Sequence, residues 1–72
     1  MSDIQALLFD KNYYNKRDIK AFLKRHNLVP CKEIHETKKY YRQRLIQPNY
    51  KKFKYRFYNI KTGLDAILQY NK

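Results

Sequence analysis

The chain has few of the residues that cross-link small domains. It contains a single Cys, so no internal disulfide is available. Trp is absent, and the chain has one Met, one Gly and two Pro. No apolar run approaches the ~18–20 residues of a membrane span. Asp3 stands where a signal peptide would carry a basic residue, and the apolar stretch after it is short. We therefore expect no membrane span and no secretion.

Acidic residues are also scarce. Six Asp and Glu face 17 Lys and Arg, which gives a formal net charge of +11. Such a charge favours polyanionic partners: nucleic acid first, and an anionic membrane or an acidic protein second. Residues 38–61 contain nine basic residues and no acidic one, so a functional face is expected there. Codon composition is an alternative source of the excess, because Lys, Asn, Tyr and Ile, all encoded by AT-rich codons, make up 32 of the 72 residues.

The apolar and aromatic content of the chain predicts a folded domain. Apolar residues make up 43% of the chain and aromatic residues 17%, more than a disordered chain of this charge usually has. Residues 1–72 are the size of a single small domain. A core this small gives only a few kcal/mol of net stability.

Residues 16–26 predict a helix. Asn15 is a suitable N-cap, Asn27 suits the left-handed position after the helix, and Pro30 prevents continuation. One face of this helix carries Ile19, Phe22, Leu23 and His26.

Strands are predicted over 3–9, 31–36, 39–46 and 53–60. Residues 64–70 fit both a short helix and a strand, and a strand is favoured because the segment is short and a hairpin turn precedes it. In the first strand both alternating sets are apolar, Ile4, Ala6 and Leu8 on one face and Leu7 and Phe9 on the other. This pattern is typical of a strand covered on both faces. Phe53, Tyr55 and Phe57 alternate with charged residues and are expected in the core, and Gly63 is expected in a turn. The predicted fold is α+β, in the order β-α-β-β-β-β, with one amphipathic helix on a mostly antiparallel four- to five-stranded sheet.

Four segments carry a resemblance to a family: IQALLFD, DIKAFLKRHNLVP, ETKKYYRQRLIQP and TGLDAIL. Together they resemble a small uncharacterised domain that recurs in proteins of bacteriophages and large DNA viruses. Phe22-Leu23 stands where that pattern often has Trp-Leu, and Tyr70-Asn71 stands where it usually ends near a glycine. The resemblance implies the fold and a viral context, and it supplies no catalytic residue.

Basic and aromatic residues alternate in KKYYRQR and YKKFKYRFY. Lys and Arg can neutralise phosphates, and Tyr rings can stack on unpaired bases. If strands 39–46 and 53–60 are neighbours, their cations form one patch with two Tyr side chains inside it. A solvated sheet face is the alternative. The candidate nucleic-acid-binding residues are Lys38, Lys39, Tyr40, Arg42, Arg44, Lys51, Lys52, Lys54, Arg56 and Tyr58.

Metal binding and catalysis are not expected. His26, Cys31, His35 and Glu36 lack the repeated short spacings of structural zinc sites, and Cys31 is expected to be a small buried residue. The six carboxylates form no motif that would hold Mg²⁺, and no glycine-rich phosphate loop is present. We therefore expect no cofactor and no enzyme activity. The basic helix face of Lys16, Arg17, Lys20 and Lys24 is expected to be solvated.

The sequence favours a non-enzymatic nucleic-acid-binding module, for DNA or RNA, that makes largely sequence-independent phosphate and stacking contacts. The alternative is a small structural or assembly component of a virus particle whose basic face docks an acidic protein. In either case, the expected location is inside the host cell or inside a virus particle.

Overall fold

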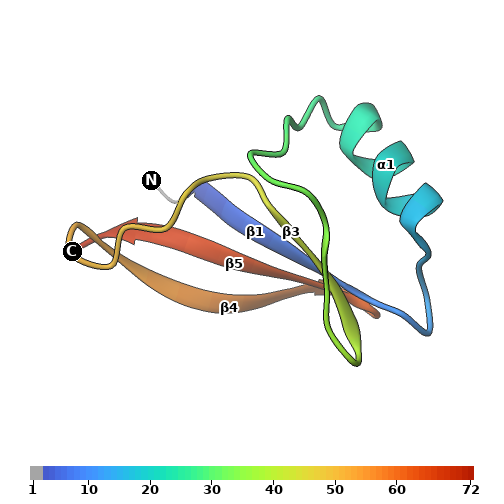
Figure 1. Cartoon of the computed structure of the whole chain (residues 1–72). Coiled ribbons are helices and arrows are strands. Elements are labelled where there is room, and N and C mark those ends of the chain that lie inside the picture. Colours follow the sequence, from blue (N-terminus) through green and yellow to red (C-terminus); the bar gives the residue numbers. More distant parts are fainter. Residues whose placement is uncertain (1–2) are drawn as a thin grey trace.

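The structure is a computed structural model that describes residues 3–72 (Figure 1). Its elements are β1 (Asp3–Asp10), α1 (Lys16–Arg25), β2 (His35–Glu36), β3 (Tyr40–Arg44), β4 (Phe53–Lys61) and β5 (Leu64–Asn71). The strands form one sheet in the order β2-β3-β1-β5-β4, and every neighbouring pair is antiparallel. The predicted α+β fold with one helix is confirmed.

The central strand is β1, which pairs with β3 on one side and β5 on the other. Gln5–Phe9 are all buried, as predicted for a strand with apolar residues at both alternate positions. Leu7 and Phe9 face α1, whereas Ala6 and Leu8 point to the other side of the sheet. The central position therefore buries both faces of β1: α1 covers one, and side chains of the neighbouring strands shield the other.

The helix begins with a reciprocal capping box. Asn15 Oδ1 accepts from the Asp18 amide at 2.9 Å, and the Asp18 carboxylate accepts from the Asn15 amide at 3.0 Å. Lys24 and Arg25 in the last turn complement the helix dipole. Asn27 then adopts a left-handed conformation with φ of 55°, which ends the helix as predicted.

The core lies between α1 and three strands. Ile19 and Leu23 pack on Leu7 and Phe9 of β1 and on β5. Phe22 is only half-buried, and its ring meets the Phe9 ring edge-on at 5.6 Å. A helix of ten residues is about 15 Å long and ~10 Å across, whereas four inter-strand steps make the sheet ~19 Å wide. One helix therefore covers β3, β1 and β5 and leaves β4 open (Figure 1).

Three buried glutamines tie loops and strands to the sheet. Gln5 Nε2 donates to the Ile46 carbonyl at 2.8 Å, and Gln43 Nε2 donates to the Lys32 carbonyl at 2.6 Å. Gln69 Oε1 accepts from the Tyr55 hydroxyl at 2.9 Å. Each bond satisfies a polar side chain inside the protein, where an unpaired amide would cost about 1–3 kcal/mol.

The β4–β5 turn requires its glycine. Gly63 has φ of +80°, and a Cβ there would lie 2.7 Å from the Tyr13 ring. The Gly63 carbonyl accepts from the Asp10 amide at 2.9 Å, so the turn is also tied to the end of β1. The expectation that Gly63 supplies an unusual backbone angle is confirmed.

Several sequence expectations about local structure and burial are wrong. The strand expected over 31–36 is reduced to β2, because the Gln43 side chain takes the Lys32 carbonyl that a ladder would use. Cys31 is exposed rather than buried, since it lies in the loop outside the core. Phe57 is 66% exposed rather than part of the core, because its strand extends beyond the helix and its side chain points away from α1.

α1 spans ten residues. The described part of the chain contains no helix with the length and apolar character needed to cross a bilayer.

An exposed ion pair links the edge strand β2 to the end of β1. Lys11 Nζ donates to the Glu36 carboxylate at 2.6 Å, and Lys16 lies 3.8 Å from the other carboxylate oxygen. The hydrogen bond and charge of Lys11, with a smaller effect of Lys16, hold the pKa of Glu36 below its ordinary value of 4.5. Burial opposes this shift with an effect smaller than that of Lys11 and larger than that of Lys16.

This pair predicts a pH effect with a definite sign. Because the folded-state pKa of Glu36 is lowered, its stabilisation is present above the ordinary value and is lost as the pH falls through the folded value. Lys11→Ala should raise the Glu36 pKa toward 4.5, as measured by NMR titration of the carboxyl carbon. An unchanged Glu36 pKa in that variant would contradict the pairing.

Candidate nucleic-acid interface

The two basic-aromatic strands do not lie side by side. β1 and β5 separate β3 from β4, so the backbones of β3 and β4 are about 14 Å apart, three inter-strand steps. The single patch depended on strands 39–46 and 53–60 being neighbours, and this condition is not met. The pairing of β1 with both β3 and β5 accounts for it, because the most apolar strand takes the middle of the sheet.

The predicted patch is also divided between two faces of the sheet. Arg42 lies opposite Leu8, and Arg44 lies opposite Ala6, so both point away from α1. Arg56 lies opposite Leu68, and Tyr58 lies opposite Ala66, which places both on the helix side. Lys54, two residues before Arg56, shares its face. Tyr40 shares the face of Arg42 and Arg44.

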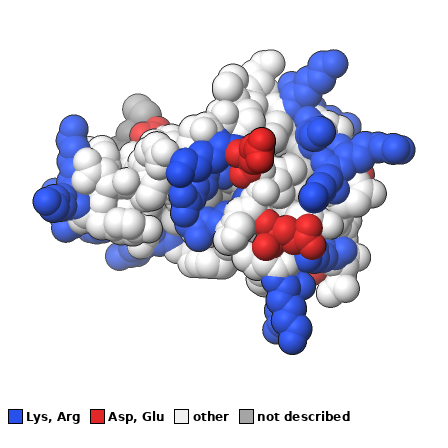
Figure 2. Space-filling model, in the orientation of Figure 1, with Lys and Arg blue, Asp and Glu red and all other residues white. Residues whose placement is uncertain are grey.

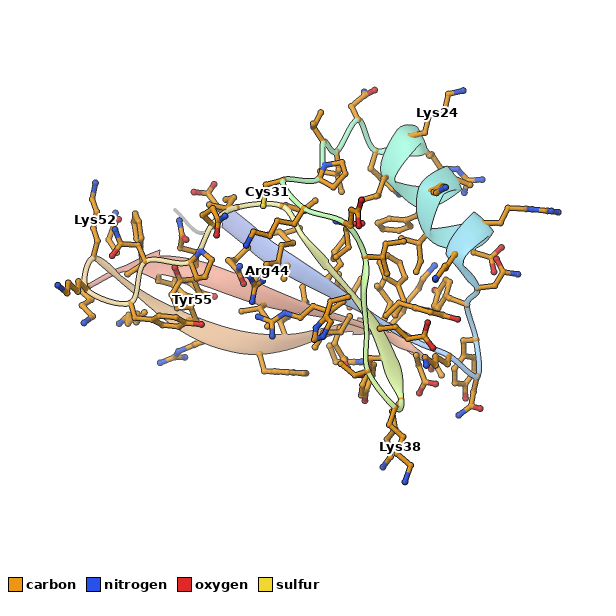
Figure 3. The ribbon with its side chains drawn as sticks, in the orientation of Figure 1. Lys24, Cys31, Lys38, Arg44, Lys52 and Tyr55 are labelled. Carbon is orange, nitrogen blue, oxygen red and sulfur yellow. The ribbon has the colours of Figure 1, made fainter. Side chains whose placement is uncertain are left out.

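The four other predicted lysines lie at opposite ends of the molecule. Lys38 and Lys39 occupy the β2–β3 turn, whereas Lys51 and Lys52 lie in the loop before β4. Figure 3 shows Lys38 and Lys52 at the two ends of the view. All four are exposed, so they contribute to the field of the protein but not to one local site.

We name the helix-free side of the sheet the open face. One row across it runs from Arg44 through Ala6 and Ile67 to Phe57. The next row runs from His35 through Arg42, Leu8 and Asp65 to Asn59. In each row an arginine lies on β3, and an uncharged side chain, Phe57 or Asn59, lies on β4. The open face is thus basic along one side and apolar to polar along the other.

A basic groove lies at the β3 side of the open face. It has a volume of about 290 Å³ and is lined by Lys32, Glu33, His35, Arg42 and Arg44. Three cations against one carboxylate give it a net positive charge. Arg42 Nε is buried and has no hydrogen-bond partner within residues 3–72. An arginine guanidinium carries a planar fork of N–H donors whose geometry matches phosphate oxygens.

An aromatic hollow lies at the β4 side, beside Arg42. Its volume is about 220 Å³, and its lining residues are Gln5, Arg42, Tyr50, Tyr55, Arg56, Phe57 and Ile67. The Tyr50 ring meets the Tyr55 ring edge-on with centroids 5.2 Å apart. Tyr55 is held by two hydrogen bonds, from the Asn49 amide at 2.7 Å and to Gln69 at 2.9 Å. The hollow therefore combines the fixed ring of Tyr55 with the exposed rings of Tyr50 and Phe57.

Sequence reasoning missed several residues of this face. Phe57 and Tyr55 were assigned to the core, and Tyr50 and Lys32 were not among the candidate binding residues. The period of two in 53–60 did place Phe53, Tyr55 and Phe57 on one face, which the register confirms. The signal that could have corrected their burial is Gln69, a polar residue on the neighbouring strand that Tyr55 must satisfy.

Charge is distributed widely over the surface. Figure 2 shows Lys and Arg at both ends of the visible face, and the most prominent acidic side chains lie close to basic ones near its middle and right. On the open face, Asp65 accepts from Asn59 Nδ2 at 2.7 Å, so this carboxylate is engaged by a neutral partner. Net charge alone does not select a site, and the open face is distinguished by its cations lying beside exposed rings.

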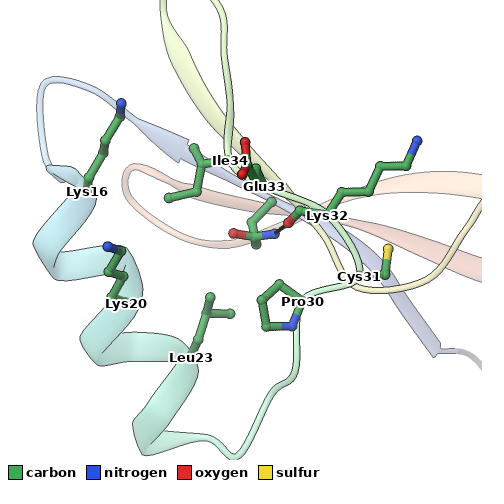
Figure 4. Close-up of a pocket in the computed structure, with 9 residues that line it drawn as sticks. Lys16, Lys20, Leu23, Pro30, Cys31, Lys32, Glu33 and Ile34 are labelled. Atoms are coloured by element: carbon green, nitrogen blue, oxygen red, sulfur yellow. Dashed lines mark hydrogen bonds between the residues drawn. The ribbon is translucent and has the colours of Figure 1, made fainter.

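A larger hollow lies elsewhere, between α1 and the loop after it (Figure 4). Its volume is about 660 Å³, with Lys16, Lys20 and Leu23 on one wall and Pro30–Ile34 on the other. Lys32 points away from the helix in this view. Within residues 3–72, no three His, Cys, Asp or Glu side chains gather where they could hold a metal ion.

The fold and this face define a class: a small α+β domain with one helix and one uncovered, basic-aromatic sheet face. No protein-family model, curated protein or solved structure matches the chain. The resemblance to the small viral domain therefore stays a prediction.

Proposed function

We propose that the protein is a non-enzymatic nucleic-acid-binding module that uses the open face of its sheet. The observation that carries the proposal is the adjacency of the basic groove and the aromatic hollow, which share Arg42. Lys32, Arg42 and Arg44 would contact phosphates, a sequence-independent interaction driven by release of counterions. The viral context implied by the resemblance, and a location inside a host cell or virus particle, are proposed with it.

The binding should depend steeply on salt. Fluorescence anisotropy with a labelled oligonucleotide should give a log affinity that falls linearly with log salt, by about 0.7 per phosphate contact on single strands and about 0.9 on duplex. With three contacts, the slope on single strands should be about −2. Absence of binding at low salt, to single strands and duplex alike, would contradict the proposal.

One observation favours a second candidate function, docking of an acidic protein. β4 is a nine-residue strand at one edge of the sheet. It carries the cations Lys54, Arg56 and Lys61 and no acidic side chain. An acidic extended segment could add to that edge through backbone hydrogen bonds. A second copy of the chain fits less well, because β4 would bring like charges together.

A further inference from the structure

We propose, on the basis of the function above, that the open face takes single-stranded nucleic acid, with unpaired bases stacked in the aromatic hollow and phosphates in the basic groove. The proposal adds the substrate class and identifies Phe57 as the residue that distinguishes single strands from duplex.

The dimensions of the face exclude the grooves of a duplex. The sheet is about 19 Å wide, whereas the major groove of B-DNA is about 12 Å wide. A five-stranded sheet face therefore contacts a duplex only at its phosphates. In that contact the rings of Phe57 and Tyr50 would meet the sugar–phosphate backbone and gain nothing from the bases, which remain stacked inside the helix.

The exposed rings have a use on a single strand. Phe57 and Tyr50 are each 66% exposed and belong to the same hollow, beside the half-buried Ile67. Every base offers a flat π-face, so such rings bind unpaired bases without selecting their sequence. Sheet faces with exposed aromatic side chains bind single strands in this way.

The hollow is preorganised for stacking. Two hydrogen bonds of the Tyr55 hydroxyl fix its ring, which meets the Tyr50 ring edge-on. Asn49 also accepts from the amides of Lys51 and Lys52 at 3.2 Å, which holds the loop that carries Tyr50. A site that is ordered before binding loses less conformational entropy when the ligand arrives.

Arg42 and Arg44 lie where they could contact the phosphate backbone of a bound strand. Arg44 and Phe57 are the two ends of one row, about 14 Å apart at the backbone, and small or apolar Ala6 and Ile67 lie between them. The length of the arginine side chain shortens this gap. A strand of nucleic acid that follows β3 could then place its phosphates on Arg42 and Arg44 and its bases toward β4.

Two neighbouring residues form a matched pair for the test. Phe57 and Tyr58 are consecutive and both exposed, at 66% and 54%, but Phe57 lies on the open face and Tyr58 on the helix side. The variants Phe57→Ala and Tyr58→Ala should both melt within a few degrees of the wild type, because neither ring is in the core. Phe57→Leu is a further variant that keeps an apolar side chain and removes the flat ring.

The experiment titrates the full chain and each variant into a labelled oligothymidine of about 12 nucleotides and into a duplex of similar length. We expect Phe57→Ala to weaken single-strand binding about 5- to 150-fold, the range of one base–aromatic stack. Phe57→Leu should lose a similar factor. The salt slope should stay the same, and Tyr58→Ala should bind within about twofold of the wild type, since its ring faces away from the site.

The outcomes separate the two proposals. Equal affinity for single strands and duplex, with no effect of Phe57→Ala, would overturn single-strand stacking and leave phosphate binding intact. A loss on Tyr58→Ala but not on Phe57→Ala would also overturn it. Failure of the wild type to bind either form at low salt would overturn the proposed function together with this inference.

Discussion

Phe9→Ala should unfold most of the protein at room temperature. Phe9 is fully buried, and its ring meets those of Tyr14 and Phe22 edge-on at 5.3 and 5.6 Å. Truncating such a residue costs about 3–5 kcal/mol, which matches the few kcal/mol that a core of this size supplies. Urea unfolding followed by circular dichroism should show the loss.

Phe57→Ala is the matched control, because it removes the same ring from an exposed position. We expect its free energy of unfolding to lie within about 0.5 kcal/mol of the wild type. Equal destabilisation by the two substitutions would contradict the assignment of Phe9 to the core and Phe57 to the surface.

A triple variant of the basic groove should lose most nucleic-acid affinity. Lys32→Gln, Arg42→Gln and Arg44→Gln together remove three cations from one groove. Since each contact adds about 0.7 to the salt slope on single strands, three lost contacts weaken binding on the order of 100-fold at about 0.1 M salt. Stability should change little, and Arg42→Gln also removes a buried donor that lacks a partner within the described residues.

The matched control removes three cations from α1: Arg17→Gln, Lys20→Gln and Lys24→Gln. Each triple variant lowers the formal net charge from +11 by three, to +8. The α1 cations lie on the other side of the sheet from the open face, and the Debye length at 0.1 M salt is about 10 Å. We expect a loss of less than about fivefold from them. Equal losses in the two variants would mean that net charge, and not the groove, determines binding.

The sequence predicted the elements well, because their periodicity and capping are local properties. Asn15 with Asp18 marks the start of α1, Asn27 its end, and Gly63 the β4–β5 turn. Strand 3–9, with apolar residues on both of its faces, also predicted its own burial on both faces. The exception is 31–36, where the strand is shortened because a distant side chain, Gln43, binds the backbone.

The order of the strands and the extent of the sheet that α1 covers depend on contacts between distant segments. The sequence was therefore insufficient to predict them. Alternation in 53–60 shows that Phe53, Tyr55 and Phe57 share a face, but it does not show which face α1 covers or how far. Only the order β2-β3-β1-β5-β4 places β4 beyond the helix.

The candidate site residues fall into two groups: those predicted from the pattern of their own strand, and those that depended on which strands are neighbours. Arg42, Arg44 and Tyr40 were predicted from their own strand and do share the open face. Arg56 and Tyr58 were joined to them on the assumption of neighbouring strands, and the register places them on the helix side. The aromatic partners on the open face are instead Tyr55 and Phe57, joined by Tyr50 from the loop before β4.

Mapping the contact surface by NMR tests the central claim most directly. The ¹⁵N-labelled chain would be titrated with an oligothymidine at low salt, and amide and arginine side-chain shifts would be followed. We expect saturable shifts on the open face, in Arg42 and Arg44 of β3 and in Tyr55 and Phe57 of β4, with α1 nearly unchanged. Shifts confined to Lys16–Arg25, or no shifts at all, would contradict the account.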